Sequence, residues 1–383
     1  MMRLAALGIF FLLLVVPDTR AAEGGFLSFK DDLDRESLRL AIQRSLDFLD
    51  KVPPERVVGD RPRNLTAQEI KESLLSFLDL LEFWDRPKML SEAIRSRFDL
   101  FPSMDEPAEI LLTGYYQPVI EGSLTPSEVF RFPIYGKPKD LVEAEIVTLR
   151  PERRTEKIVG LVDHGQFVSY FSRYEIDQLG ALKGKGYEIA WVKDPVNLFF
   201  LHIQGSGLLK LEDGRIVPVN YSASNGRPYK SIGKVLIDSG KIAEGELSMQ
   251  RLRRYLTEHP EERDALFAQN ERYVFFRFVQ EGPLGSLEVP LTPGRSLATD
   301  TQFFPQGALA FVAAERPVLD RGGNLIGWQP FSRFVVNQDT GGAIQGQKRA
   351  DLYFGSGDAA GSAAGFLKST GRLFILLKKK SGP

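Results

Sequence analysis

Three aspartates lie within one glycine-rich stretch, QDTGGAIQGQKRADLYFGSGDAAG, which runs from Gln338 to Gly361. They are Asp339, Asp351 and Asp358. Asp351 stands in RADLYFG, a short apolar and aromatic run typical of a strand, where Asp351 and Tyr353 would share one face. A carboxyl group flanked by apolar side chains is partly desolvated, which favours its protonated form. Asp351 therefore has the setting that a general acid requires.

Other kinds of site also combine aspartates with glycines. A phosphate loop requires Lys followed by Ser or Thr at a helix start, and a calcium loop requires oxygen ligands at alternating positions; the stretch has neither pattern. An aspartic protease requires two Asp-Thr/Ser-Gly sequences, and the chain has DTG at Asp339 and DSG at Asp238. Because KVLIDSGK reads as a helix end capped by Gly240, the sequence disfavours that pairing. A role in which all three aspartates only cap turns stays open.

A second group of motifs combines aromatic, amide, hydroxyl and glycine residues. These motifs are GYYQP (114–118), HIQGSG (202–207) and NYSASNGRPYKSIG (220–233). Flat rings that stack on sugars, with amides and hydroxyls beside them, are typical of sugar-binding grooves, but ordinary turns of a β-domain use the same residues. The chain has no cysteine, and its three histidines are far apart, so the sequence predicts no metal site and no cofactor.

The elements that would position these motifs change in character near Ile110. Before it, the spacing of apolar residues predicts helices, one of which begins with a capping box formed by Thr66 and Glu69. Another helix is predicted from Pro87 to Phe98. After Ile110, short β-branched and aromatic runs bounded by Gly and Pro predict strands, including successive strands through AWVKDPVNLFFLHIQGSGLL. SIGKVLIDSGK and ELSMQRLRRYLTEHPEERDALFAQN interrupt them as helical stretches.

Composition limits the class of protein. The 383 residues include 49 basic and 50 acidic side chains, a balance that argues against nucleic acid as the main partner. Leu4 to Val16 is an uninterrupted apolar run of about 20 Å as a helix, too short for a bilayer core of about 30 Å. We expect residues 1–22 to be a signal peptide, with an uncleaved membrane anchor as the alternative. Without cysteine, no lipid can be attached through a thiol.

Taken in order, the motifs resemble the MltA family of lytic murein transglycosylases, including its 3D domain, named for three aspartates. The resemblance runs from about Leu112 to Leu377 and rests on LTGYYQP, FFLHIQGSGLLKLEDG, YSASNGRPYKSIGKVLID, NERYVFFRF, GPLGSLEVPLTPGRSLATD and the opening stretch. It implies a mainly β chain with N-terminal helices. A double-psi β-barrel domain would comprise residues 23–107 plus 282–383, with the 3D segment at about 335–378. A smaller inserted β-domain, residues 108–281, would line a glycan groove.

The reaction that the resemblance implies is non-hydrolytic cleavage of the β-1,4 bond between N-acetylmuramic acid and N-acetylglucosamine. It leaves a 1,6-anhydro ring, and a single aspartate acts first as acid and then as base. Asp351 matches the family's catalytic aspartate, and Asp339 matches its neighbour in the site. Asp358 is expected to be structural. The candidates for substrate binding or support are Tyr115, Tyr116, Gln117, Gln204, Ser206, Asn225, Asp300 and Tyr353.

The implied partner is the peptidoglycan glycan strand in the periplasm, with cell-wall synthesis or division complexes as further partners. The family is named for a lipid anchor on a cysteine, which this sequence lacks, so we expect a soluble periplasmic protein or one held by an uncleaved signal. Two alternatives stay open. One is a muramidase-type hydrolase in which Asp339 is the second carboxylate, and the other is a non-catalytic peptidoglycan-binding protein.

Overall fold

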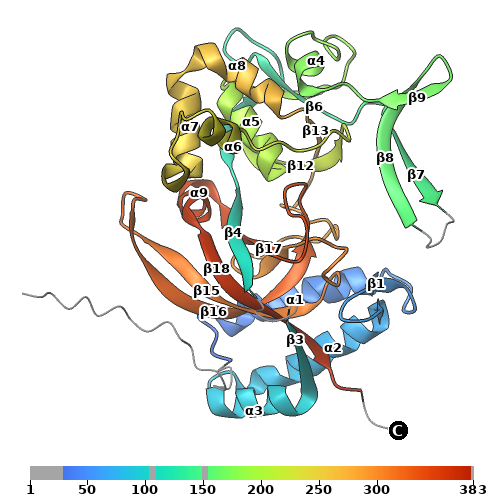
Figure 1. The fold of residues 1–383 in the computed structure, drawn as a ribbon, viewed down its shortest axis with the longest axis vertical. Coiled ribbons are helices and arrows are strands. Elements are labelled where there is room, and N and C mark those ends of the chain that lie inside the picture. Colours follow the sequence, from blue (N-terminus) through green and yellow to red (C-terminus); the bar gives the residue numbers. More distant parts are fainter. Residues whose placement is uncertain (1–28, 103–108, 149–153, 381–383) are drawn as a thin grey trace, which may run out of the picture.

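The computed structural model describes residues 29–102, 109–148 and 154–380, so the expected signal peptide lies outside the described residues. The chain forms a β-barrel with N-terminal helices packed below it and an inserted unit above it (Figure 1). Strand β4 (Glu109–Gln117) leaves the barrel and leads, after Pro118, into the first strand of the insert, β5 (Val119–Ser123). The described part of the chain contains no helix with both the length and the apolar character needed to cross a bilayer.

The barrel is a ring of six strands. Their order around the ring is β15-β16-β14-β17-β4-β18, and a direct pairing of β18 with β15 closes it, while β3 extends β18 at one edge. The pairs β14–β16 and β17–β4 are parallel, and the other pairs in the ring are antiparallel. Besides β4, the strands are β3 (Phe98–Pro102), β14 (Ser296–Ala298), β15 (Leu309–Leu319), β16 (Leu325–Asp339), β17 (Arg349–Ser356) and β18 (Lys368–Lys378).

Three N-terminal helices cover the barrel: α1 (Arg35–Leu49), α2 (Ala67–Leu80) and α3 (Pro87–Arg97). The expected capping box is present at the start of α2, where Thr66 accepts from the amide of Glu69 and Glu69 accepts from the amide of Thr66. A short 3-10 helix (Leu81–Phe83) and the small pair β1 (Val57–Gly59) and β2 (Leu65–Thr66) complete this region. Rings from helix and barrel meet in one core, as between Phe77 and Phe334, whose centroids lie 4.8 Å apart.

A buried ion pair fixes the start of the described chain to the barrel. Asp31 and Arg295 are joined by a bond of 2.6 Å, and their side chains are 2% and 0% exposed. Oδ2 of Asp31, which binds Arg295, also accepts from the amide of Phe334 at 2.7 Å, and Oδ1 accepts from the amide of Leu33 at 2.8 Å. Arg295 donates in addition to the carbonyl oxygens of Phe334 and Asp34. Both charges are therefore compensated, as buried charges must be.

The insert is built on a second six-stranded sheet, in the order β13-β12-β11-β5-β10-β6. Helices cover it, and a three-stranded arm, β7-β8-β9, projects from its side (Figure 1). Its further strands are β6 (Phe132–Tyr135), β7 (Val142–Thr148), β8 (Arg154–Asp163), β9 (Gln166–Ser169), β10 (Glu188–Val192), β11 (Ser206–Lys210), β12 (Ile216–Ser224) and β13 (Val274–Phe278). Its helices are α4 (Arg173–Asp177), α5 (Pro195–Gln204), α6 (Ile232–Asp238), α7 (Met249–Glu258) and α8 (Pro260–Gln269), with a 3-10 turn at Glu244–Glu246.

The insert was predicted to begin at residue 108. Strand β4 is hydrogen-bonded between β17 and β18, so the first residues of the predicted insert also form part of the barrel wall. One expectation about this region is corrected. Residues 195–204 were predicted as strand, and they form helix α5. Asp194 caps this helix by accepting from the amide of Val196, Pro195 occupies its first position, and Gly205 ends it in the left-handed conformation at φ 75°.

Candidate active site

Two of the three aspartates lie on neighbouring parts of the barrel wall. Asp339 ends β16 and Asp351 lies in β17, and the short strand β14 runs between them. Ala298 of β14 is the register partner of both. On its other side, Asp351 is paired with Thr113 of β4. Four strands therefore place Asp339, Ala298, Asp351 and Thr113 in one row across the sheet.

The carboxylate of Asp351 has one oxygen held and one free. Its Oδ1 accepts from the hydroxyl of Thr113 and from Nε of Arg349, the latter at 3.3 Å. Its Oδ2 has no hydrogen-bond partner among the residues that the structure describes. The side chain is 13% exposed and that of Arg349 is 34% exposed. A carboxylate that is oriented through one oxygen can exchange a proton with a substrate through the other.

Asp339 is held through both oxygens. Its Oδ1 accepts from the amides of Ser286 and Thr340 at 2.9 and 2.8 Å, and its Oδ2 accepts from the hydroxyl of Tyr115 at 2.9 Å. Burial raises the pKa of Asp339 to about 6. The three hydrogen bonds oppose this shift, and the negative charge of Asp351 adds to it. Asp339 is thus a fixed group whose charge changes near neutral pH.

Two tyrosines form the wall beside the carboxylates. Tyr115 and Tyr353 are register partners on β4 and β17, and their ring centroids lie 5.3 Å apart. Tyr353 is 2% exposed, and burial raises its pKa to about 12. Burial, followed by the charge of Asp339, raises the pKa of Tyr115 well above its usual value. Both phenols therefore stay protonated at neutral pH, and Tyr115 acts as a donor to Asp339.

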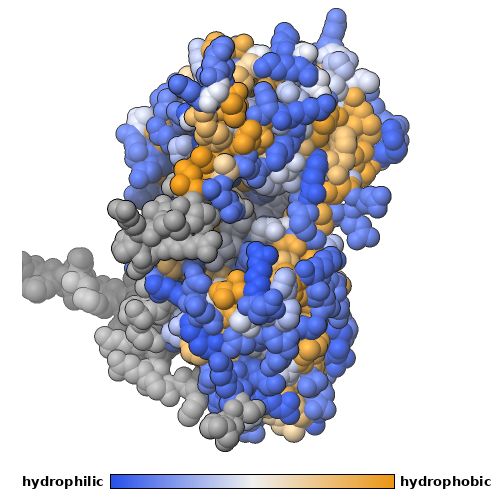
Figure 2. Space-filling model, turned by 90° about the vertical axis from the view of Figure 1, so that its right-hand side faces the viewer, coloured by the Kyte–Doolittle hydropathy of each residue, from blue (hydrophilic) through white to orange (hydrophobic). Residues whose placement is uncertain are grey.

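A hollow separates the insert from the barrel, and Figure 2 shows it between the upper and lower halves of the molecule. Tyr229, in the loop after β12, lies close enough to respond to both charges on the wall. Burial raises its pKa, its bond with Ser231 and the charge of Arg349 lower it, and the charge of Asp351 raises it. Tyr229 stands within NYSASNGRPYKSIG, but no local signal distinguished it from the other polar residues of that motif.

Comparison with known proteins agrees with this architecture. The model of the MltA specific insert domain matches residues 111–277, and that of the 3D domain matches residues 295–377. Membrane-bound lytic murein transglycosylase A of Escherichia coli K12 is 35% identical over 277 residues, which is 71% of this chain and 67% of that protein. The chain belongs to the MltA family. The corresponding protein of Vibrio cholerae is 32% identical over 275 residues, which cover 71% of this chain and 66% of that one.

Solved structures of the MltA family share the fold. A membrane-bound lytic murein transglycosylase from Agrobacterium tumefaciens matches with a TM-score of 0.72 and 32% identity, over 90% of this chain and 93% of that one. Escherichia coli MltA with bound chitohexaose matches with a TM-score of 0.66 and 28% identity, over 89% of each chain. The predicted fold class is therefore confirmed: a mainly β chain with a double-psi barrel, N-terminal helices and an inserted unit.

Four further candidates cluster where β4 enters the insert, rather than around the two carboxylates. Gln204, the last residue of α5, accepts from the amide of Tyr116 at 3.0 Å. Gln117 accepts from the hydroxyl of Ser356 at 3.0 Å, while its own Nε2 is buried without a partner. Ser206 is buried at the start of β11. The bond between Gln204 and the amide of Tyr116 joins the MltA-type insert to the barrel wall.

Asn225 and Asp300 use their side chains to hold backbone. Asn225 is 1% exposed and donates to the carbonyl oxygens of Phe171 and Glu271 at 2.9 and 2.8 Å. Asp300 accepts from the amide of Gly346 at 2.7 Å, which fixes the loop between β16 and β17. Both side chains thus hold backbone segments of the structure, and their predicted contact with substrate stays a prediction.

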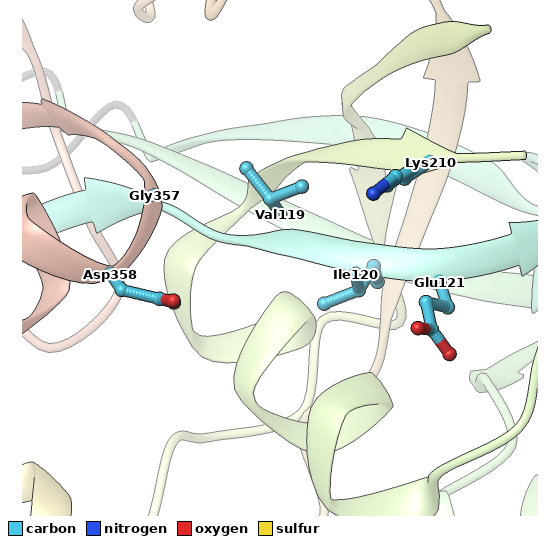
Figure 3. Close-up of a pocket in the computed structure, with 6 residues that line it drawn as sticks. All are labelled: Val119, Ile120, Glu121, Lys210, Gly357 and Asp358. Carbon is cyan, nitrogen blue, oxygen red and sulfur yellow. The ribbon is translucent and has the colours of Figure 1, made fainter. Parts of the chain in front are cut away.

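Asp358 lies apart from the other two aspartates. It was expected in a glycine-rich turn, but it is an exposed residue in the first turn of helix α9 (Gly357–Phe366). It lines a cavity of about 380 Å³ at the junction of α9 with β5 and β11, shown in Figure 3. The other lining residues are Val119, Ile120, Glu121, Lys210 and Gly357.

The aspartic-protease pairing fails on geometry. The DSG aspartate, Asp238, is the last residue of helix α6 in the insert, whereas Asp339 ends a barrel strand, so the two do not form a protease pair. Within the described ranges, no group of three or more His, Asp or Glu side chains is arranged to hold a metal ion. The candidate site is built from carboxylates, hydroxyls and one arginine, Arg349.

Proposed function

We propose that this member of the lytic murein transglycosylase family cleaves the β-1,4 bond between N-acetylmuramic acid and N-acetylglucosamine without adding water. Asp351 would be its only proton-transfer group. The observation that carries this proposal is the asymmetry of the two carboxylates. Oδ2 of Asp351 is unoccupied by any described residue, whereas both oxygens of Asp339 accept hydrogen bonds.

In the first step, protonated Asp351 gives its proton to the glycosidic oxygen. The bond from that oxygen to C1 of the muramic acid breaks, and positive charge develops at C1. In the second step, the C6 hydroxyl of the same sugar attacks C1 and gives its proton to the Asp351 carboxylate. A 1,6-anhydro ring forms, and the acid is regenerated. One carboxyl group suffices because the substrate supplies the nucleophile that a retaining glycosidase takes from its second carboxylate.

Asp339 would act by its charge. An ionised carboxylate in a partly buried wall stabilises positive charge that develops nearby, and it needs no movement to do so because three donors already fix it. Tyr115 and Tyr353 would keep this wall rigid. Thr113 and Arg349 would orient Asp351 through its Oδ1.

The hollow between barrel and insert would hold the glycan strand. Bound chitohexaose in the Escherichia coli relative, a protein of the same fold, supports this placement. Of the predicted substrate-binding residues, Tyr115 and Tyr353 line the wall beside the acid. Tyr229 and Arg349 join them as groups that sequence reasoning did not single out. Because peptidoglycan lies outside the cytoplasmic membrane, we also propose that the enzyme works in the periplasm, where cell-wall synthesis or division complexes are its expected partners.

The mass of the products tests the reaction. Purified sacculi are digested with the enzyme, and the released muropeptides are weighed. We expect anhydro ends; products heavier by one water, about 18 Da, would instead indicate a muramidase-type hydrolase with Asp339 as second carboxylate. Binding to sacculi without any cleavage would indicate the non-catalytic alternative.

A further inference from the structure

Arg272 is a cation on the insert whose side chain reaches the barrel. It precedes β13, and its guanidinium packs across Gly342 in the loop that follows Asp339. A Cβ placed on Gly342 would lie 3.0 Å from Cζ of Arg272. The Arg272 side chain makes no hydrogen bond or ion pair with any residue in the described parts of the chain. Arg272 is partly exposed, and the loop against which its guanidinium packs begins directly after Asp339.

The backbone that carries Arg272 is fixed by two buried side chains. Arg173 donates to the carbonyl oxygens of Asn270 and Arg272 at 3.0 and 2.7 Å. Asn225 donates to the carbonyl oxygen of Glu271 at 2.8 Å and accepts from the amide of Tyr273 at 2.8 Å. Four consecutive residues therefore each have a backbone group bound by a buried polar side chain, and Arg272 is in the middle of the run.

The side chain of Arg173, which binds the segment 270–272, is itself buried and surrounded by partners. Its side chain is 3% exposed and lies 3.5 Å from the carboxylate of Asp177. Its guanidinium also lies 5.0 Å from the ring centroids of Phe199 and Tyr273. A buried guanidinium destabilises a fold unless it is paired and hydrogen-bonded. Here those bonds go to the segment 270–272, and rigid support of this kind is what a precise binding site requires.

We propose that Arg272 binds a carboxylate of the peptide stem on a muramic acid in the groove, so that the enzyme prefers strands with anionic stems. This inference rests on the proposed function. The sugars of an intact strand are uncharged, and the anions lie on the peptide stems attached to them. A guanidinium presents a planar fork of donors that matches a carboxylate, and that of Arg272 packs on the loop that follows Asp339.

The test compares two substrates that differ only in stem charge. Uncross-linked glycan strands with native stems are used directly or after carbodiimide and ammonium have converted the stem carboxylates to amides. For wild type, amidation is expected to lower kcat/KM by about tenfold or more, since a charged hydrogen-bonded pair is lost. Arg272→Gln should lower kcat/KM on native strands by a similar factor and leave cleavage of amidated strands unchanged. Arg272→Lys should retain part of the preference.

Arg321→Gln, at the exposed tip of the β15–β16 hairpin, is the matched control and should behave as wild type. Equal losses on both substrates would show that Arg272 only packs the loop, and would overturn the inference, as would full activity of Arg272→Gln on native strands. If the variant does not fold, the wild-type ratio decides alone, and equal cleavage of native and amidated strands overturns the proposal. Absence of anhydro products from wild type on either substrate would instead contradict the proposed function.

Discussion

Asp339 and Asp351 are register partners of the same residue, Ala298, one from each side of strand β14. Two strand spacings place their Cα atoms about 10 Å apart. A single strand separates them, so the two aspartates occupy one row across the sheet. Their contacts nevertheless differ, and this difference assigns them separate roles.

Replacement of Asp351 by Asn should abolish cleavage while the fold is retained. The amide cannot deliver a proton to the glycosidic oxygen, and general acid–base catalysis contributes about 10²- to 10⁴-fold. We expect release of anhydro-muropeptides to fall by at least about a hundredfold. Asp358→Asn is the matched control, since Asp358 is exposed on α9, and it should keep near-wild-type activity. Comparable activity of Asp351→Asn and wild type would contradict the assigned role.

Replacement of Tyr115 by Phe should move the acid limb of the pH–rate profile. The lost hydroxyl is a donor that lowers the pKa of Asp339, now about 6, so its removal raises that pKa further. Since the charged form of Asp339 is the useful one, kcat/KM should fall off about one pH unit higher than in wild type. Tyr221→Phe, at an exposed position on β12, is the control. If the acid side of the pH–rate profile does not move, ionisation of Asp339 does not determine it.

Replacement of Asp339 by Asn should change how stability depends on pH. The pKa of Asp339 is raised by folding from 3.8 to about 6, so the folded state binds the proton more tightly than the unfolded state. Its contribution to stability is fully present below pH 3.8 and is lost as pH rises through about 6. Between pH 4 and pH 7, the free energy of unfolding of wild type should fall by up to about 3 kcal/mol relative to that of Asp339→Asn. Urea unfolding at both pH values measures this, and a pH-independent difference would exclude it.

Replacement of Asp31 by Ala should strongly destabilise the fold without touching the site. It leaves the guanidinium of Arg295 buried without its charge partner, which costs about 3–5 kcal/mol. Glu36→Ala removes one partner of an exposed pair and should cost about 0.5 kcal/mol or less. Chemical denaturation of the two variants provides the comparison. Similar midpoints would show that water reaches Arg295.

Local chemistry in the sequence was sufficient where a few neighbouring residues determine the structure. The capping box of Thr66 and Glu69 needs only its own helix turn, and it is present. The alternation of a strand predicted that Asp351 and Tyr353 share a face. Their pairing with Thr113 and Tyr115 agrees with this.

Helix α5 was mistaken for a strand because it has no polar face to reveal its period. Val196, Phe199, Phe200 and His202 are all buried, so the apolar run NLFFLHI looks the same as a buried strand. The signals that would have corrected the prediction were Asp194 and Pro195 at the start and Gly205 at the end. They are the local features that define this helix.

Helix α9 was missed because it is rich in glycine, which disfavours helix but allows close packing. A Cβ on Gly361 would lie 2.8 Å from the ring of Tyr116, and one on Gly365 would lie 2.6 Å from the side chain of Gln250. Small residues let this helix approach both barrel and insert. The packing of the insert on the barrel also brings Tyr229 and Arg272 near the candidate site. The sequence does not show this packing, so neither residue could be predicted.

Strand β18 closes the ring by pairing with β15 and β4, and it follows every residue of the site in the chain. A growing polypeptide that already contains Thr113, Asp339 and Asp351 therefore still lacks the strand that locks them in register. We therefore expect a chain cut before β18 to carry Thr113, Asp339 and Asp351 without a closed barrel to hold them. Its activity would be lost although every residue of the candidate site is present.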